Sequence, residues 1–150
     1  MRATDELRHD HATLRGKLAQ LEEWLPFLKA APFTLLNVTR TLTRRLHTHT
    51  EREEQLLLAL RERLRGKESS IADSFPAEHQ DQRQTLRLLL ELLANGHDAP
   101  ADQVEADATH LIESLREHMA NEEAVLFPLA DRVFGVVEEV CHERSVAAHR

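Results

Sequence analysis

The stretch LREHMANEEAVLFP, residues 115–128, places a histidine and a glutamate in the apolar stripe of an otherwise amphipathic helix. His118 and Glu122 are four residues apart, so on a helix they point to nearly the same side as Leu115. A glutamate that faces a dry core is strongly disfavoured unless it is paired, protonated or bound to a cation. The stretch therefore predicts a helix whose buried face carries a polar site.

The same arrangement occurs in HTEREEQLL, residues 49–57, and histidines also interrupt the apolar stripes of two further predicted helices. Four histidines and two carboxylates suit two transition-metal ions, because carboxylates can bridge the ions while imidazoles occupy terminal positions. We therefore interpret these side chains as a metal site. Its predicted ligands are His11, His49, Glu53, His79, His118 and Glu122.

The chain has few helix-breaking residues, with four glycines and five prolines among 150 residues. These residues separate long segments whose apolar side chains recur at three- and four-residue steps, as packed helices require. The sequence therefore predicts an all-α, up-down-up-down antiparallel four-helix bundle over residues 1–134. A short C-terminal helical tail, residues 135–150, is expected to pack on the bundle or extend from it. The predicted helices cover approximately residues 4–25, 33–65, 76–95 and 101–134.

Distances along the helices indicate that the predicted ligands can meet. His79 lies about 16 residues before the turn near residues 96–100 and His118 about 18 after it, so at roughly 1.5 Å per residue both are near 25 Å from the turn. His11 and His49 are matched in the same way about the connection between the first two helices. The four histidines are therefore expected at similar levels along the bundle.

The connection between the second and third helices must also run back along the bundle. Residues 66–75 must return along the bundle by about 10 to 15 Å, which ten residues can span. We expect Ile71 and Phe75 to pack against the bundle as the chain does so.

Other side chains receive structural interpretations. Thr4 is a candidate cap of the first helix, and Trp24 is expected in the core. In the fourth helix the apolar stripe is expected to continue through Val125 and Leu129. Pro128 lacks a backbone donor, so the helix is predicted to bend just beyond the metal site.

The quoted stretches resemble the hemerythrin-like, or HHE cation-binding, family. The His-x-x-x-Glu-Glu elements at His49 and His118 look like its paired motifs, whereas RHDHATLRGKL and AEHQDQRQTLRLLLELL, around His11 and His79, look like its first and third helices. The likeness covers roughly residues 7–128. Ferritin-like carboxylate bundles use Glu-x-x-His instead, with the opposite order and a different spacing.

This resemblance implies a bundle around a non-haem di-iron centre that binds or senses dioxygen, nitric oxide or peroxide, or handles iron under oxidative or nitrosative stress. It implies the six residues above as ligands, with Glu53 and Glu122 as bridges between two iron ions in an oxo- or carboxylate-bridged centre. Zinc or manganese would also accept these donors. If the site turns over, peroxidase-like, catalase-like or oxidase activity is expected. The alternative is a metal-binding regulatory or interaction module without turnover.

Two departures from the oxygen-carrying hemerythrins are visible. Arg83 stands where the carriers have a second histidine on the third helix, and their final carboxylate corresponds to Glu123 rather than Glu122. A site with less nitrogen and more open positions argues against simple reversible oxygen carriage. Glu54 and Glu123 point about 100° away from the stripe, so they are predicted to be solvated or to hydrogen-bond a ligand imidazole.

Composition restricts the partners. The net charge of -7, spread along the chain, argues against a nucleic-acid surface and against binding to an anionic membrane. The expected partner is a small diatomic molecule or peroxide. No apolar signal core follows Met1, so a cytoplasmic location is expected, and the lone Cys141 cannot form a disulfide within the chain. A metal-free structural bundle would leave the stripe glutamates unexplained.

Overall fold

The structure, a computed structural model, describes residues 1–95, 98 and 100–135. Its elements are helical, and η1 is a 3-10 turn whereas η3 is a π-helical segment. In chain order they are α1 (Asp5–Trp24), η1 (Leu25–Phe27), α2 (Pro32–Arg63), α3 (Lys67–Asp73), α4 (Phe75–Ala94), α5 (Ala101–Asn121), η3 (Glu122–Leu126) and α6 (Phe127–Phe134).

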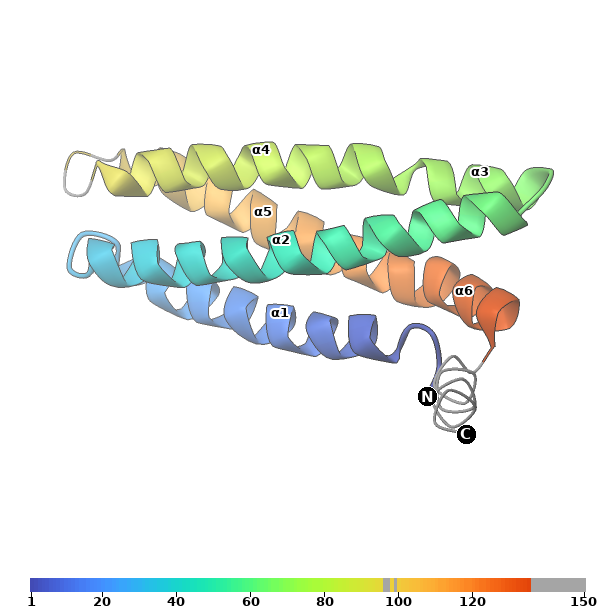
Figure 1. Ribbon diagram of the computed structural model, residues 1–150. Coiled ribbons are helices and arrows are strands. Elements are labelled where there is room, and N and C mark those ends of the chain that lie inside the picture. The colour runs from blue at the N-terminus through green and yellow to red at the C-terminus, as the bar shows by residue number, and fades with distance from the viewer. Residues whose placement is uncertain (96–97, 99, 136–150) are drawn as a thin grey trace, which may run out of the picture.

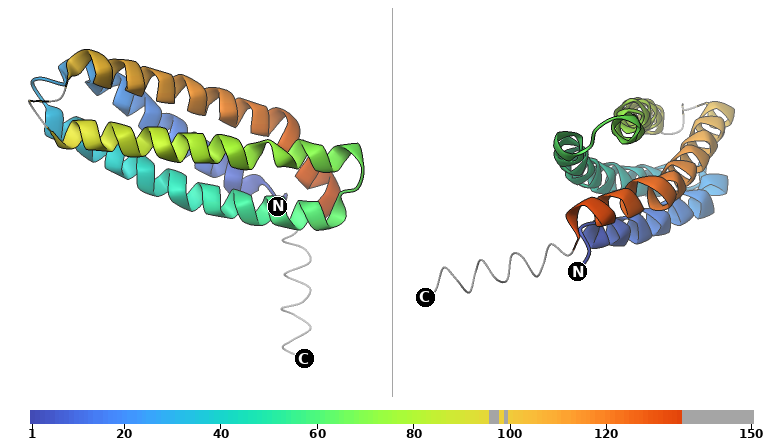
Figure 2. Two further views of the ribbon diagram at one scale, coloured as in Figure 1. Left: turned by 90° about the horizontal axis from the view of Figure 1, so that it is seen from above. Right: turned by 90° about the vertical axis from the view of Figure 1, so that its right-hand side faces the viewer.

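Four long helical rods form an antiparallel bundle, with α5, η3 and α6 joined into the fourth rod (Figure 1). The rods form a ring, because α1 packs on α2, α2 on α4, α4 on α5 and α5 on α1. Figure 2 shows this ring from above and from one end. The predicted all-α four-helix bundle is therefore confirmed. The predicted tail helix lies outside the described residues from position 136 onward. Among the described residues, no helix combines the length and hydropathy needed to cross a membrane.

The return between α2 and α4 is made by a helix. Gly66 has φ 72°, a value that favours glycine, and the chain reverses there from α2 into α3. α3 then runs in line with α4 (Figure 1). At 1.5 Å per residue its seven residues advance about 10 Å, in agreement with the predicted return. As predicted, Phe75 is buried and Ile71 packs partly buried against the same hydrophobic cluster.

The core consists of two hydrophobic clusters separated along the bundle. The larger cluster includes Leu18, Leu42, Leu89 and Leu111. The second cluster lies further toward α3 and α6 and is built around the side chains of Leu7, Leu57, Leu60, Phe75, Leu126 and Phe127. On every rod, polar residues of the predicted site stand in sequence between the members of the two clusters. The bundle therefore carries one buried polar layer between two apolar layers.

The fourth rod changes its helical pitch at η3. The backbone N–H of Phe127 bonds to the carbonyl of Glu122, five residues back, and Pro128 has no N–H to offer the preceding turn. This extra residue rotates the helix face, so Leu126 is fully buried whereas Val125 is 45 % exposed. The predicted stripe was therefore wrong at Val125. The irregularity also begins at Glu122 itself rather than beyond the site.

The start of α1 is tied to α6. Thr4 directly precedes α1, as the sequence predicted, but its hydroxyl makes no capping bond to that helix. The Thr4 hydroxyl instead donates to Asp131 at 2.9 Å and its N–H donates to the same carboxylate at 3.1 Å. Arg8 also reaches Asp131 at 3.3 Å. These contacts close the end of the bundle beside the second cluster.

Trp24 was predicted in the core, but it lies at the surface. Its side chain is 38 % exposed, and its ring meets the edge of Phe27, which is 53 % exposed. Leu21 and Leu28 are buried on the neighbouring turns. Leucines therefore close the core at this end of the bundle, and the indole lies on the outer side.

Substitutions at η3 test the change of helix face. Leu126→Ala should lower the free energy of unfolding by about 2 to 5 kcal/mol, because it removes a fully buried side chain. The matched change Val125→Ala should alter it by less than about 1 kcal/mol, because Val125 is largely exposed. Urea unfolding of the metal-free protein measures both. Equal losses at the two positions would contradict the described π-helical segment.

Candidate metal centre

The structure brings all six predicted site residues into the polar layer. Each is at most 6 % exposed, and four rods contribute to the group. We refer to these side chains as the six site residues: His11 from α1, His49 and Glu53 from α2, His79 from α4, His118 from α5, and Glu122 at the start of η3.

The site residues form two groups that share both glutamates. The first group joins His11 and His49 to Glu53 and Glu122, and the second joins His79 and His118 to the same glutamates. Within each group the ligand atoms lie within 4.8 Å of one another. The imidazole Nε2 atoms point at the shared carboxylates: His11 and His118 approach Glu122 Oε1 at 3.3 and 3.1 Å. His79 Nε2 approaches Glu53 Oε1 at 3.5 Å, and His49 Nε2 contacts Glu53 Oε2.

The shared carboxylates are buried without hydrogen bonds. All four oxygens of Glu53 and Glu122 lack a hydrogen-bond partner among the described residues, although imidazoles lie within ion-pair distance. Such oxygens are costly in an apolar bundle unless a cation is present. Convergent imidazole nitrogens and carboxylate oxygens match the ligand preferences of transition metals. The six site residues therefore fit a pair of metal ions, with two carboxylates between them.

Every site histidine turns its other ring nitrogen, Nδ1, toward an outer carboxylate. The contacts are His11 with Glu123 at 3.3 Å, His49 with Asp10 at 3.0 Å, His79 with Glu54 at 3.7 Å, and His118 with Glu78 at 2.5 Å. A carboxylate at Nδ1 favours the proton on that nitrogen and leaves Nε2 free to bind a metal. Hydrogen bonds to outer carboxylates therefore orient the imidazoles of His11, His49 and His118 toward the shared glutamates, whereas Glu54 lies near His79 Nδ1 without such a bond.

Comparison with known families decides the assignment. The hemerythrin HHE cation binding domain matches residues 2–130. The chain belongs to this family. No curated protein and no solved structure gave a significant match. The family and the two histidine and glutamate groups together indicate that this HHE domain is a metal-binding protein.

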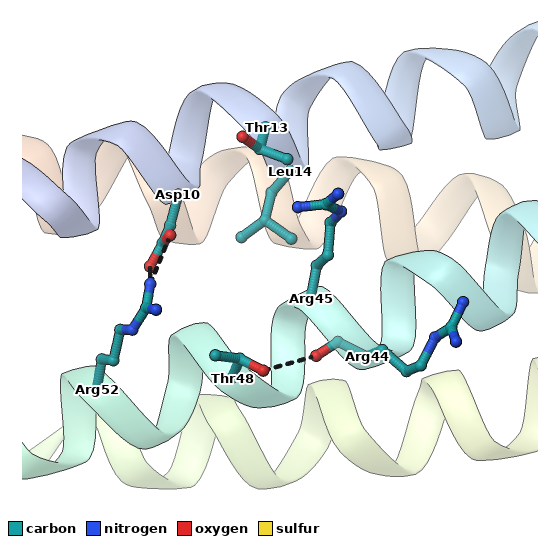
Figure 3. Close-up of a pocket in the computed structure, with 7 residues that line it drawn as sticks. All are labelled: Asp10, Thr13, Leu14, Arg44, Arg45, Thr48 and Arg52. Atoms are coloured by element: carbon teal, nitrogen blue, oxygen red, sulfur yellow. Dashed lines mark hydrogen bonds and ion pairs between the residues drawn. The ribbon is translucent and has the colours of Figure 1, made fainter.

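Arginines hold three of the outer carboxylates of the HHE domain. Arg15 donates to both oxygens of Glu123 at 2.6 Å. Arg52 donates to Asp10 at 2.9 and 3.0 Å, as Figure 3 shows. These charge-assisted bonds restrict the carboxylates that orient His11 and His49. Within the part of the chain that the structure describes, no arginine pairs with Glu78, which is the outer partner of His118.

Arg83 lies outside the metal centre although it replaces a histidine of the oxygen carriers. Its guanidinium donates to Glu54 at 2.8 Å, and Glu54 faces Nδ1 of His79. Glu54 and Glu123 therefore lie beside imidazoles of the site residues, in the region where they were predicted. Asp10 and Glu78 were missed, although each directly precedes a site histidine in the chain. The sequence pattern did not indicate their role, because each contacts a histidine of another helix rather than its neighbour in sequence.

The HHE centre has an internal two-fold pattern. Each site residue of α1 has a counterpart in α4 that lies 68 positions later, so His11 matches His79. Each site residue of α2 has a counterpart 69 positions later, so Glu53 matches Glu122. The outer contacts follow the same rule: the contact of Arg15 with Glu123 matches that of Arg83 with Glu54. The two halves therefore present equivalent sets of candidate ligand atoms.

Burial and contacts set the protonation of the metal-free site. Burial lowers the pKa of His11 to about 4 and also lowers the pKa of His118. Burial opposes protonation of His49 as well, but the adjacent Glu53 carboxylate and the hydrogen bond to Asp10 outweigh it and raise the His49 pKa. For Glu53, burial favours the neutral acid, yet the close imidazoles of His49 and His79 lower the carboxyl pKa to about 2. The Glu53 carboxylate is thus ionised at neutral pH and can attract a cation.

The stability of the metal-free domain should fall as the pH decreases from about 6.5 to about 4. Because the folded pKa of His11 is about 4, the unfolded chain takes up that proton first, and the stability contribution of His11 is lost across this interval. His118 acts in the same direction, whereas the contribution of His49, whose pKa is raised, is already complete at about pH 6.5 and does not change the slope below it.

Urea midpoints between pH 4 and pH 7 measure this dependence. His11→Gln should flatten it, because it removes the buried imidazole. His110→Gln, at an exposed position, should leave the slope unchanged. A midpoint that rises as the pH decreases would show that the buried histidines are protonated in the folded domain.

Proposed function

We propose that this HHE domain holds a non-haem di-iron centre that binds or senses dioxygen, nitric oxide or peroxide, or handles iron under oxidative or nitrosative stress. The observation that carries the proposal is the pair of shared glutamates, whose four buried oxygens lack hydrogen bonds among the described residues. Each glutamate lies within reach of imidazoles from both halves of the site. A bridging role between two cations explains both features.

The ligand count favours iron over zinc. Each half of the centre offers two imidazoles and two shared carboxylates, which is four protein residues. Four donors complete the tetrahedral shell of a structural zinc ion. Non-haem iron instead functions with open positions that take a small ligand, and manganese accepts the same donors. We therefore infer iron as the metal that makes use of this site.

Residues of the chain would hold the ions and protect them. When bound, iron supplies redox chemistry and open positions for a small ligand. Glu53 and Glu122 would bridge the ions, and the outer carboxylates keep Nε2 of the imidazoles to which they hydrogen-bond directed inward. The two hydrophobic clusters exclude water from both sides of the polar layer, and the ring of Phe127 lies 4.9 Å from that of His11. The site would therefore be reached from between the rods.

Metal content tests the ligand assignment. Fully loaded protein should contain two ions per chain, because the two groups of ligand atoms share only the glutamates. Glu53→Gln should lower metal affinity more than Glu54→Gln, since Glu54 contacts only the far nitrogen of His79. Elemental analysis and competition with a chelator measure both effects. A stoichiometry of one, or equal losses in the two variants, would contradict the proposed ligands.

Optical spectra test the function. Anaerobically reduced, iron-loaded protein should change its absorption spectrum on addition of air, nitric oxide or hydrogen peroxide, because open iron positions accept these ligands. Zinc-loaded protein is the matched control and should show no such change, since zinc has no redox chemistry. Two bound iron ions with no response to any of the three ligands would instead indicate a regulatory module without turnover.

A further inference from the structure

The internal two-fold pattern breaks down at two matched clefts that flank the metal centre. One cleft, of about 230 Å³, lies between α1 and α2, and the other, of about 190 Å³, lies between α4 and α5. Six of the seven residues in each lining correspond under the same offsets of 68 and 69 residues, and the exceptions are Arg44 in the first cleft and His118 in the second. The matched pairs that differ in chemistry are Thr13 with Asp81, Leu14 with Gln82, Arg45 with Ser114, Thr48 with Glu117, and Arg52 with Asn121.

The α1–α2 cleft ends before the metal centre. Figure 3 shows Arg52 paired with Asp10 on one side and Leu14 between the two helices. Leu14 is 2 % exposed, and no site histidine lines this cleft. The arginine clamp and the leucine therefore separate His49 from the cleft.

The α4–α5 cleft reaches one site histidine. His118 itself lines this cleft, beside its outer partner Glu78. The clamp is missing, because the counterpart of Arg52 is Asn121, whose shorter neutral side chain cannot pair with the Glu78 carboxylate as an arginine does. A small molecule that enters here meets the half of the centre held by His79 and His118.

Gln82 stands in this cleft where its counterpart is a leucine. It follows His79 by three residues, so the two side chains lie on the same face of α4. Gln82 is 4 % exposed, and its Oε1 atom has no hydrogen-bond partner among the described residues. A buried amide oxygen without a partner is costly, and an apolar residue fills the matched position in the other half. The amide therefore indicates a polar ligand beside His79 and His118.

Charge disfavours an anionic ligand in this cleft. The α4–α5 cleft is lined by the acidic residues Glu78, Asp81 and Glu117, whereas the α1–α2 cleft is lined by three arginines. Carboxylates at the opening disfavour an anion such as azide or superoxide. An amide can both donate and accept a hydrogen bond, which suits a molecule that also does both. Hydrogen peroxide belongs to this class.

We propose that hydrogen peroxide, or a neutral molecule of the same class, enters through the α4–α5 cleft and is positioned by Gln82 at the half of the centre formed by His79 and His118. This inference rests on the proposed di-iron function and specifies its ligand and route. The half formed by His11 and His49 remains covered on the matched side by Leu14 and by the pair of Arg52 with Asp10.

Two substitutions give the α4–α5 cleft the residues that cover the centre in the α1–α2 cleft. Gln82→Leu and Asn121→Arg should each keep two iron ions per chain and lower the rate constant of the peroxide-induced spectral change by about tenfold, the effect of one lost hydrogen bond or of a closed route. Gln82→Leu should also raise the urea midpoint of the metal-free protein, because it removes a buried amide oxygen that lacks a hydrogen-bond partner. Gln84→Leu, at an exposed position of the same helix, is the control and should keep the wild-type rate.

The outcomes separate this inference from the function on which it rests. Wild-type protein that binds two iron ions and responds to dioxygen or nitric oxide but not to peroxide would overturn this inference and leave the proposed function standing, whereas no response to any of the three would overturn both. A normal peroxide response with an unchanged rate in Gln82→Leu, or a slower rate accompanied by lost metal or a lower metal-free midpoint, would overturn only the role of Gln82.

The charge argument has its own test. Asp81→Asn and Glu117→Gln should strengthen azide binding, measured by titration of the iron-loaded protein, by a larger factor than they alter the peroxide rate. A peroxide rate that changes in parallel with azide affinity would overturn the assignment of a neutral ligand.

Discussion

Two glutamates buried at the centre of an apolar bundle are the constraint on which the rest of this structure depends. Glu53 and Glu122 have no exposed surface, and their oxygens accept no hydrogen bond from a described residue. The hydrophobic effect drives the four rods together, but these carboxylates require a cation at the point where the rods meet. The two hydrophobic clusters on either side hold the helices at the spacing at which two ions can satisfy both carboxylates.

The outer carboxylates convert this requirement into a fixed register between helices. Each one neighbours a site residue in sequence but contacts a histidine of another helix, so Asp10 of α1 orients His49 of α2. A shift of one helix along its neighbour would separate these pairs. Arg15, Arg52 and Arg83 then restrict three of the four carboxylates from the surface side. No described arginine pairs with the fourth carboxylate, Glu78. The two halves of the centre differ at this carboxylate.

Most of the fold and the candidate site followed from side-chain periodicity. Histidine and glutamate at stripe positions were sufficient to select His49 with Glu53, and matched distances from the turns indicated that the four rods bring their polar residues to one level. Val125 was assigned wrongly, because a π-helical segment changes the helix face by one residue and periodicity assumes a constant pitch. Trp24 was assigned wrongly because it lies at the end of the bundle, where Leu21 and Leu28 close the core.

The sequence by itself determined the family, the four-helix architecture and the identity of the six site residues, because each depends on residue types at helical spacing within one segment. Only the tertiary structure decided which residues support them. Asp10 and Glu78 meet histidines of other helices, Arg83 faces Glu54 instead of the metal centre, and the clefts beside Leu14 and Gln82 differ in whether they reach a site histidine. These relations depend on how neighbouring helices are rotated and aligned, and periodicity along a single helix carries no information on either.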